Sequence, residues 1–242
     1  MTLLAVERIK LFSTRAPVWC VATALALTIG ATAGLVWLNG RHSDGVTPES
    51  TQTLYILGLV VTMVMATLSV TTEYRFGTIR ATFQAVPSRT RALLAKATVL
   101  ALVAGVVGEV SSFGSWGVAR LITASSNTDI ATAAEWRQIA GMGLVYAIAA
   151  VLAVAVGALL RQSAAAVAIL LVFPLLVEQL VEIIPGVGER LHDWMPFVAA
   201  GQFASTVDRG LPYGPWGGLL YFAAVAAALL VAALVVVEKR DA

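Results

Sequence analysis

Six stretches of this 242-residue chain are apolar over about 20 residues each, and they limit the possible folds more than any other feature. A helix needs about 20 apolar residues to cross a hydrocarbon core of roughly 30 Å. The run AAVAAALLVAALVVV (223–237) is apolar on every face, so it lacks the alternation of a membrane β-strand. With 59% hydrophobic and 12% charged residues, the chain is predicted to be an all-α integral membrane protein.

We expect a single transmembrane domain over residues 1–242. Its six transmembrane helices are predicted at 17–38, 52–72, 97–119, 139–160, 163–184 and 216–237. Residues 1–15 mix apolar and charged positions, which favours a short interfacial helix whose basic side chains reach lipid headgroups. Residues 185–215 are too polar to span and are rich in aromatic residues. They are predicted to form an external re-entrant segment of short helices in the outer interface.

The basic residues are distributed unequally between the two sides of the predicted membrane. Most of the 16 Lys and Arg residues fall on the side that holds both termini and the 73–96 connection. Basic residues accumulate in cytoplasmic loops of membrane proteins. We therefore predict a multi-pass protein of the inner or plasma membrane, with both termini and the 73–96 loop in the cytoplasm.

The 73–96 connection, EYRFGTIRATFQAVPSRTRALLAK, concentrates charge and turn residues between two apolar spans. Ile79 and Phe83 lie four residues apart, which predicts a short amphipathic helix. Gly77 supplies a break before this helix, and Pro87 ends it. The helix has one face for the membrane and one for a partner. Alternatively, the segment is an interfacial loop whose charges only fix the topology.

The residue order in this loop resembles the cytoplasmic loop of ABC-2 type transporter permeases. The shared order is a glutamate, Gly-Thr, an apolar helix, Pro-Ser-Arg and a lysine that enters a span. The matching residues are Glu73, Gly77, Thr78, Pro87, Ser88, Arg89 and Lys96. The topology is also similar, with an N-terminal helix that carries Glu7, Lys10 and Ser13, a tight turn between the fourth and fifth spans, and an external segment before the sixth.

The resemblance implies that the loop contains a coupling helix, which docks on a separate ABC ATP-binding subunit. It implies ATPase-coupling roles for Glu73, Gly77, Thr78, Ile79, Phe83, Pro87 and Arg89. The chain would pair with a second permease copy, identical or paralogous, in the lipid bilayer. It would export a hydrophobic small molecule, either lipophilic or amphipathic, such as a drug, an antibiotic or a lipid-like compound.

Sequence motifs for chemistry are nearly absent. There is no GxxxxGK[ST] sequence, so no ATP site and no enzymatic activity are predicted for this chain, and ATP and Mg would bind to the partner subunit. His42 and His192 lie far apart without a cluster of Cys or His, so we predict no metal site and no cofactor. The basic loop is better explained by anionic lipid than by nucleic acid.

Three carboxylates are candidates for a substrate pathway. Glu109 lies near the middle of the third predicted span, where a charge costs at least about 2–3 kcal/mol and therefore faces protein or water. Glu178 and Glu182 are four residues apart on the fifth span, so we expect them to share a face, one turn after a kink at Pro174. The alternatives are an interhelical hydrogen bond for Glu109 and plain solvent exposure for the other two.

Two other classes of function stay open. An intramembrane enzyme would use Glu109, Glu178 and Glu182 for acid–base or metal chemistry, which requires the three carboxylates to converge. A non-transporting membrane anchor or sensor would require no ATPase partner and would tolerate substitutions in the 73–96 loop.

Overall fold

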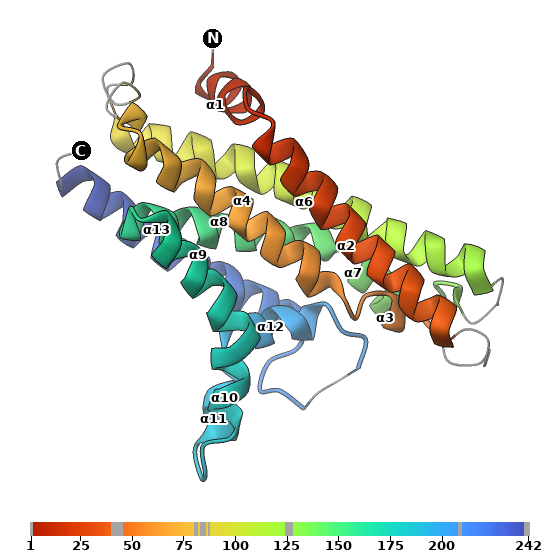
Figure 1. The fold of residues 1–242 in the computed structure, drawn as a ribbon. Helices are drawn as coiled ribbons and strands as arrows, with labels where there is room; N and C mark the ends of the chain where they lie inside the picture. Colours follow the sequence, from red (N-terminus) through yellow and green to blue (C-terminus); the bar gives the residue numbers. More distant parts are fainter. Residues whose placement is uncertain are drawn as a thin grey trace.

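The computed structural model describes residues 2–39, 46–79, 82, 86, 88–123, 128–207 and 210–239, and the regular secondary structure in these ranges is helical (Figure 1). The helices are α1 (Leu3–Phe12), α2 (Ala16–Asn39), α3 (Pro48–Thr51), α4 (Tyr55–Arg75), α6 (Arg89–Thr123), α7 (Ala133–Ala140), α8 (Met142–Leu160), α9 (Ser163–Val172), the π-helical turn η3 (Phe173–Val177), α10 (Glu178–Glu182), α11 (Gly188–His192), α12 (Pro196–Phe203) and α13 (Pro215–Lys239).

Six helical segments are long and apolar enough to cross a membrane. They run over Ala16–Leu38, Pro48–Arg75, Arg89–Thr123, Ala133–Leu160, Ser163–Glu182 and Pro215–Lys239. Five of these segments contain the corresponding predicted span completely. The exception is Ser163–Glu182, which ends two residues before the predicted end at residue 184. The predictions of an all-α fold and of six helices long and apolar enough to cross a membrane are confirmed for the described residues.

Helix α8 forms the centre of the bundle and packs against α4, α6 and α13. The span that contains it has the largest buried share of the six, whereas the spans of α2, α9 and α13 have the smallest share, 22% each. Seven of the 12 buried residues of α8 are alanine or glycine, which lets neighbouring helices approach closely. The apolar surface of the outer helices suits contact with lipid.

Both termini lie at the same end of the bundle, which we call the terminal end, while α3, α7 and α12 lie toward the opposite, or far, end (Figure 1). Helix α1 precedes α2 at the terminal end. Termini on one side agree with an even number of crossings. The side of the membrane on which they lie remains a prediction.

The fifth span changes direction where α9 passes through η3 into α10 (Figure 1). Pro174 lies in η3 and has no backbone N–H to donate, which disfavours a regular α-helical turn at this point. Beyond it, α10 and α11 project from the bundle as an arm. The predicted segment 185–215 does contain short helices, α11 and α12, and α12 packs against α13.

Tyr146 of α8 fills a gap left by two glycines on neighbouring helices. A Cβ atom at Gly108 of α6 would lie 2.7 Å from Tyr146 Cγ, and one at Gly58 of α4 would lie 2.7 Å from Tyr146 Oη. The Tyr146 hydroxyl donates a hydrogen bond of 2.7 Å to the carbonyl oxygen of Tyr55. A large side chain therefore joins three helices without leaving its polar atom unpaired.

Gly108→Ala should destabilise the protein by about 1–3 kcal/mol, because the added methyl group overlaps the Tyr146 ring. Gly117→Ala in the same helix is the matched control, since no atom lies within 4 Å of its added Cβ. We expect a lower thermal unfolding temperature in detergent for Gly108→Ala and an unchanged or higher one for Gly117→Ala. Equal unfolding temperatures for the two variants would contradict this packing.

Candidate functional site

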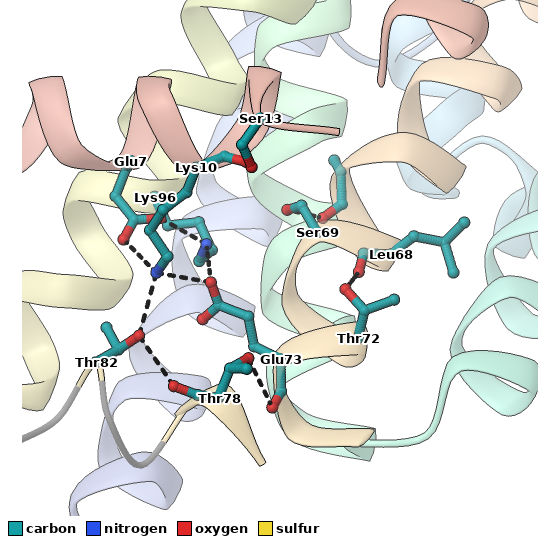
Figure 2. Close-up of polar contacts among 11 residues, drawn as sticks. Glu7, Lys10, Ser13, Leu68, Ser69, Thr72, Glu73, Thr78, Thr82 and Lys96 are labelled. Carbon is teal, nitrogen blue, oxygen red and sulfur yellow. Dashed lines mark hydrogen bonds and ion pairs between the residues drawn. The ribbon is translucent and has the colours of Figure 1, made fainter. Parts of the chain in front are cut away.

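Four charged side chains from three helices meet at the terminal end (Figure 2). Lys10 Nζ lies 2.9 Å from Glu7 Oε1 and 2.7 Å from Glu73 Oε1. Lys96 Nζ lies 2.5 Å from Glu7 Oε2 and 3.1 Å from Glu73 Oε1. Each ammonium group thus contacts both carboxylates, and the positive and negative charges balance. We call these four residues the ion cluster.

The sequence of α1 places the cluster's first two members toward the bundle. Glu7 and Lys10 are three residues apart and so lie on one face of the helix. Glu7 and Leu11 are buried, whereas Leu4 and Ile9 are exposed. The helix therefore turns a charged face inward and an apolar face outward, an orientation that suits contact of the outer face with lipid.

Three members of the cluster are deeply buried. The residues Glu7, Glu73 and Lys96 are 5%, 9% and 7% exposed, whereas the side chain of Lys10 is 33% exposed. Buried charges of this kind add little net stability as a set, but loss of one partner leaves an uncompensated charge. The cluster therefore constrains the position of α1 against α4 and α6 more than it stabilises the fold.

Electrostatic contacts keep Glu7 and Lys10 ionised. Burial alone would raise the pKa of the Glu7 carboxyl. The contacts with Lys96 and Lys10 together have the larger effect and hold that pKa below its ordinary value. Burial would lower the pKa of the Lys10 ammonium group, but Glu73 and Glu7 outweigh it and raise that pKa. Both shifts favour the charged forms at neutral pH.

A cavity of about 350 Å³ adjoins the ion cluster. All four charged residues line it, together with the hydroxyl-bearing residues Ser13, Thr14, Ser69, Thr72 and Thr78. Within the described part of the chain, the buried Oε2 atom of Glu73 has no hydrogen-bond partner. The ion cluster therefore leaves one buried carboxylate oxygen of Glu73 without a hydrogen-bond partner among the described residues.

The start of the 73–96 segment is attached to this cluster. Lys10 Nζ donates a hydrogen bond of 3.1 Å to Thr82 Oγ1, which in turn donates one of 3.3 Å to the carbonyl oxygen of Thr78. Gly77 follows the end of α4 with a φ of 70°, a left-handed conformation that glycine adopts readily at helix ends. Ile79 is buried.

The helix predicted between Gly77 and Pro87 is described only in part. Phe83 and Pro87 lie outside the residues that the structure describes. The coupling helix therefore stays a prediction.

The end of the 73–96 segment is tied to α13. Arg89 Nη1 donates a hydrogen bond of 3.2 Å to the carbonyl oxygen of Val237, and the Thr90 hydroxyl donates to the Glu238 carboxylate. The Oγ atom of Ser88 accepts a hydrogen bond of 3.3 Å from the backbone N–H of Arg91, as an N-cap does. The first turn of α6 is thus held to the last turns of α13.

Glu109 joins α6 to the start of α8. Its Oε1 atom accepts a hydrogen bond of 3.0 Å from the backbone N–H of Gly143. The break between α7 and α8 at Gly141 leaves N–H groups at the start of α8 that need partners outside the helix. A Cβ at Gly143 would lie 2.6 Å from Glu109 Oε1, so glycine permits this contact. The interhelical hydrogen bond considered as an alternative for Glu109 is present.

Glu178 and Glu182 lie in different environments although they are four residues apart. Glu178 is 1% exposed, and its Oε1 atom accepts a hydrogen bond of 3.0 Å from the backbone N–H of Phe197 in α12. The side chain of Glu182 is 57% exposed, and its Oε2 atom lies 3.9 Å from His192 Nε2. The two residues expected on one face of the span thus have different surroundings: the backbone of α12 contacts Glu178 at the start of α10, whereas Glu182 at its end is exposed.

The three carboxylates contact different partners. Glu109 binds the backbone of α8, Glu178 binds that of α12, and Glu182 lies near a side chain of α11. Among the described residues, no group of three or more His, Cys, Asp or Glu side chains is placed to hold a metal ion. This arrangement does not favour a shared catalytic site.

The mutual pairing of the ion cluster was not predicted from the sequence. Lys10 was expected to reach lipid headgroups, but its ammonium group instead binds Glu7, Glu73 and Thr82. The available signal was the balance of two acidic and two basic residues at the ends of apolar helices, where unpaired charges are costly.

Comparison of the chain with protein-family models and with curated protein sequences gives no match.

Lys96→Met should destabilise the protein by about 3–5 kcal/mol, because it leaves two buried carboxylates with one ammonium group. Glu7→Gln/Lys96→Met restores the charge balance and should cost less than the sum of the two single changes. The measurement is unfolding in detergent, followed by tryptophan fluorescence. Arg120→Gln is the control: it removes an exposed ion pair with Asp129 and should cost at most about 1 kcal/mol. Wild-type stability of Lys96→Met would rule out the cluster.

The contribution of Glu7 should depend on pH. Its folded-state pKa lies below the ordinary 4.5, so its stabilisation is present above that value and is lost as the pH falls through the folded pKa. The unfolding temperatures of wild type and Glu7→Gln should therefore differ most near neutral pH and converge in acid. Measurement of both proteins across this range checks the sign, and a difference that grows in acid would refute it.

Proposed function

We propose that the chain is the permease subunit of an ATP-driven ABC transporter of the ABC-2 type. Two permease copies, identical or paralogous, pair with separate ATP-binding subunits that hold ATP and Mg. Both termini and the 73–96 segment face the cytoplasm, in an inner or plasma membrane. The transporter exports a lipophilic or amphipathic compound, such as a drug, an antibiotic or a lipid-like molecule.

The observation that carries this proposal is the ion cluster at the base of the 73–96 segment. Glu73 lies where α4 passes into that segment and contacts Lys10 of α1 and Lys96 of α6 within 3.1 Å. Separation of these groups would expose unpaired charges in a buried site, at a cost of several kcal/mol. A force applied to the segment by an ATP-binding subunit would therefore move α1, the end of α4 and the start of α6 together.

The C-terminal end of the 73–96 segment supports the same mechanism. Arg89 and Thr90 bind the backbone and a side chain of α13. Both ends of the segment are thus attached to spans, and motion of the segment would be passed to α13 as well as to α4 and α6. An interfacial loop that only fixed topology would not need these attachments.

We further propose that Glu109 and Glu182 contact the substrate pathway. Both side chains are at least partly exposed, whereas Glu178 is buried. Glu178 contributes to the pathway by holding α12 against the fifth span. This assignment agrees with a polar or cationic group on the exported compound.

The decisive experiment is purification of the tagged chain from its native membrane in mild detergent, followed by an ATPase assay. A stoichiometric ATP-binding subunit that is lost when residues 76–86 are scrambled would support the permease function. Thermal unfolding would verify that the scrambled chain remains folded. A chain that purifies alone, without ATPase activity and without an effect of scrambling, would favour a membrane anchor or sensor instead.

Gly77→Pro should uncouple ATP hydrolysis from transport. The φ of Gly77 is 70°, whereas proline fixes φ near −65°, so the chain must leave α4 in another direction. We expect export of fluorescent lipophilic dyes from inverted vesicles to fall at least about tenfold, with ATPase activity retained; tenfold corresponds to about 1.4 kcal/mol. Gly77→Asn is the control, because asparagine tolerates the left-handed region. Normal export by Gly77→Pro at normal expression would exclude this coupling role.

A further inference from the structure

The turn between α8 and α9 holds an arginine in a backbone conformation that glycine normally adopts. Arg161 and Gln162 alone connect Leu160, the end of α8, to Ser163, the start of α9. Arg161 has a φ of 55° and a ψ of 11°, which is left-handed backbone. Within the described part of the chain, it is the only residue other than glycine with a positive φ. This conformation is unfavourable for Arg161, because its Cβ atom approaches the next carbonyl oxygen.

The side chain of Arg161 contacts the end of α4. Its guanidinium carbon lies 4.9 Å from the centroid of the Tyr74 ring, in the last turn of that helix. A guanidinium group over an aromatic ring is attracted by the negative face of the ring. Unfavourable backbone conformations persist where the surrounding structure fixes them, and they are frequent in segments that change conformation. The contact with Tyr74 supplies such a constraint on the turn.

A hydrogen bond joins the same two helices. Ser163 Oγ, in the first residue of α9, donates a bond of 2.8 Å to Thr71 Oγ1 of α4, and Thr71 is buried. Thr71 precedes Tyr74 by three residues, so the two side chains lie on one face of α4. One turn earlier, Thr67 Oγ1 donates a hydrogen bond of 2.6 Å to the carbonyl oxygen of Ala153 in α8. The C-terminal part of α4 therefore has one face that binds α8 and the start of α9.

The ion cluster uses another face of the same helical turn. Glu73 directly precedes Tyr74, so its side chain leaves α4 in a different direction, toward Lys10 and Lys96 (Figure 2). The last turn of α4 is thus attached to α1 and α6 through Glu73 and to the α8–α9 turn through Tyr74. The 73–96 segment leaves α4 at this turn.

We propose that Arg161 is a positioning residue that fixes the start of the fifth span to the end of α4, so that this span follows movements of the 73–96 segment. The proposal rests on the permease function proposed above, which supplies the movement. A two-residue connection can absorb a displacement of α9 against α8 only through the dihedral angles of Arg161 and Gln162. While Tyr74 holds the Arg161 side chain, these angles stay fixed and α9 follows α4.

The fifth span would carry this movement to the far end. Helix α9 continues through η3 into α10, where Glu178 binds the backbone N–H of Phe197 in α12. The attachments at the two ends of the 73–96 segment involve α1, α4, α6 and α13. The contact between Arg161 and Tyr74 therefore adds the fifth span to the helices that the segment would move.

The test is hydrogen–deuterium exchange of the full chain in detergent, measured by mass spectrometry on peptides that cover residues 157–170. Tyr74→Leu removes the ring and should speed exchange in the first turns of α9 about two- to fivefold. Tyr74→Phe retains the ring and should exchange as the wild type does. Phe76→Leu is the matched control, because this exposed aromatic side chain contacts Arg75. Wild-type exchange in α9 for Tyr74→Leu would overturn the proposal.

Variants of Arg161 separate the side-chain contact from the backbone conformation. Arg161→Asn tolerates the left-handed region but lacks the guanidinium group, so it should speed exchange as Tyr74→Leu does. Arg161→Lys keeps a cation near the ring and should restore most of the protection. Arg161→Asn/Tyr74→Leu should exchange no faster than the faster single variant, because both changes remove the same contact. Additive effects of the two changes would overturn the proposal.

Export by the complex distinguishes transmission of movement from a purely structural role. Arg161→Asn should lower the amount of dye exported per ATP hydrolysed at least about threefold, with ATPase activity retained, and Arg161→Lys should restore it. Wild-type export per ATP by Arg161→Asn, in a complex that is active with the wild-type chain, would overturn the transmission to the fifth span. A wild-type chain that purifies without an ATP-binding subunit would instead refute the permease function, and the exchange measurement would then decide the attachment of α9 by itself.

Discussion

The cost of a buried charge without a partner governs the terminal end of this molecule. Two carboxylates and two ammonium groups form ion pairs with one another there. Removal of any one of the four therefore leaves an uncompensated charge. Because the four residues belong to α1, α4 and α6, their ion pairs fix the position of α1 relative to the other two helices. They also make the base of the 73–96 segment rigid, and the proposed transmission of force depends on that rigidity. A purely apolar contact between α1 and the bundle would permit sliding.

The same requirement for partners recurs at the starts of two helices, α8 and α12. A break in a span frees backbone N–H groups that lipid cannot bind. Glu109 supplies an acceptor at the start of α8, and Glu178 does so at the start of α12. These two carboxylates therefore connect the start of each helix to another helix of the fold. Glu182, which belongs to the projecting arm, has no such role.

The length and hydropathy of the apolar runs were enough to predict six spans, because each helix in lipid must satisfy its own backbone. Pairings between distant residues were not predictable in this way. Glu178 and Glu182 have equivalent positions in a helical pattern, and only the packing of α12 distinguishes them. Likewise, the fit of Tyr146 between Gly58 and Gly108 depends on three helices that are distant in the sequence. The periodicity of apolar residues in the sequence predicts the faces of a single helix and does not predict which helices pack together.

The separation of the cluster's members along the chain has a consequence for biosynthesis. Glu7 and Lys96 are 89 residues apart, so Glu7 cannot reach its closest partner until the first two spans and the 73–96 segment have been made. Until then, while α2 and α4 insert, Lys10 on the same helix is the basic residue of the cluster with which Glu7 can pair. Docking of α1 would then mark the arrival of the third span, and a ribosome stalled before residue 96 would carry an N-terminal helix that has not yet docked.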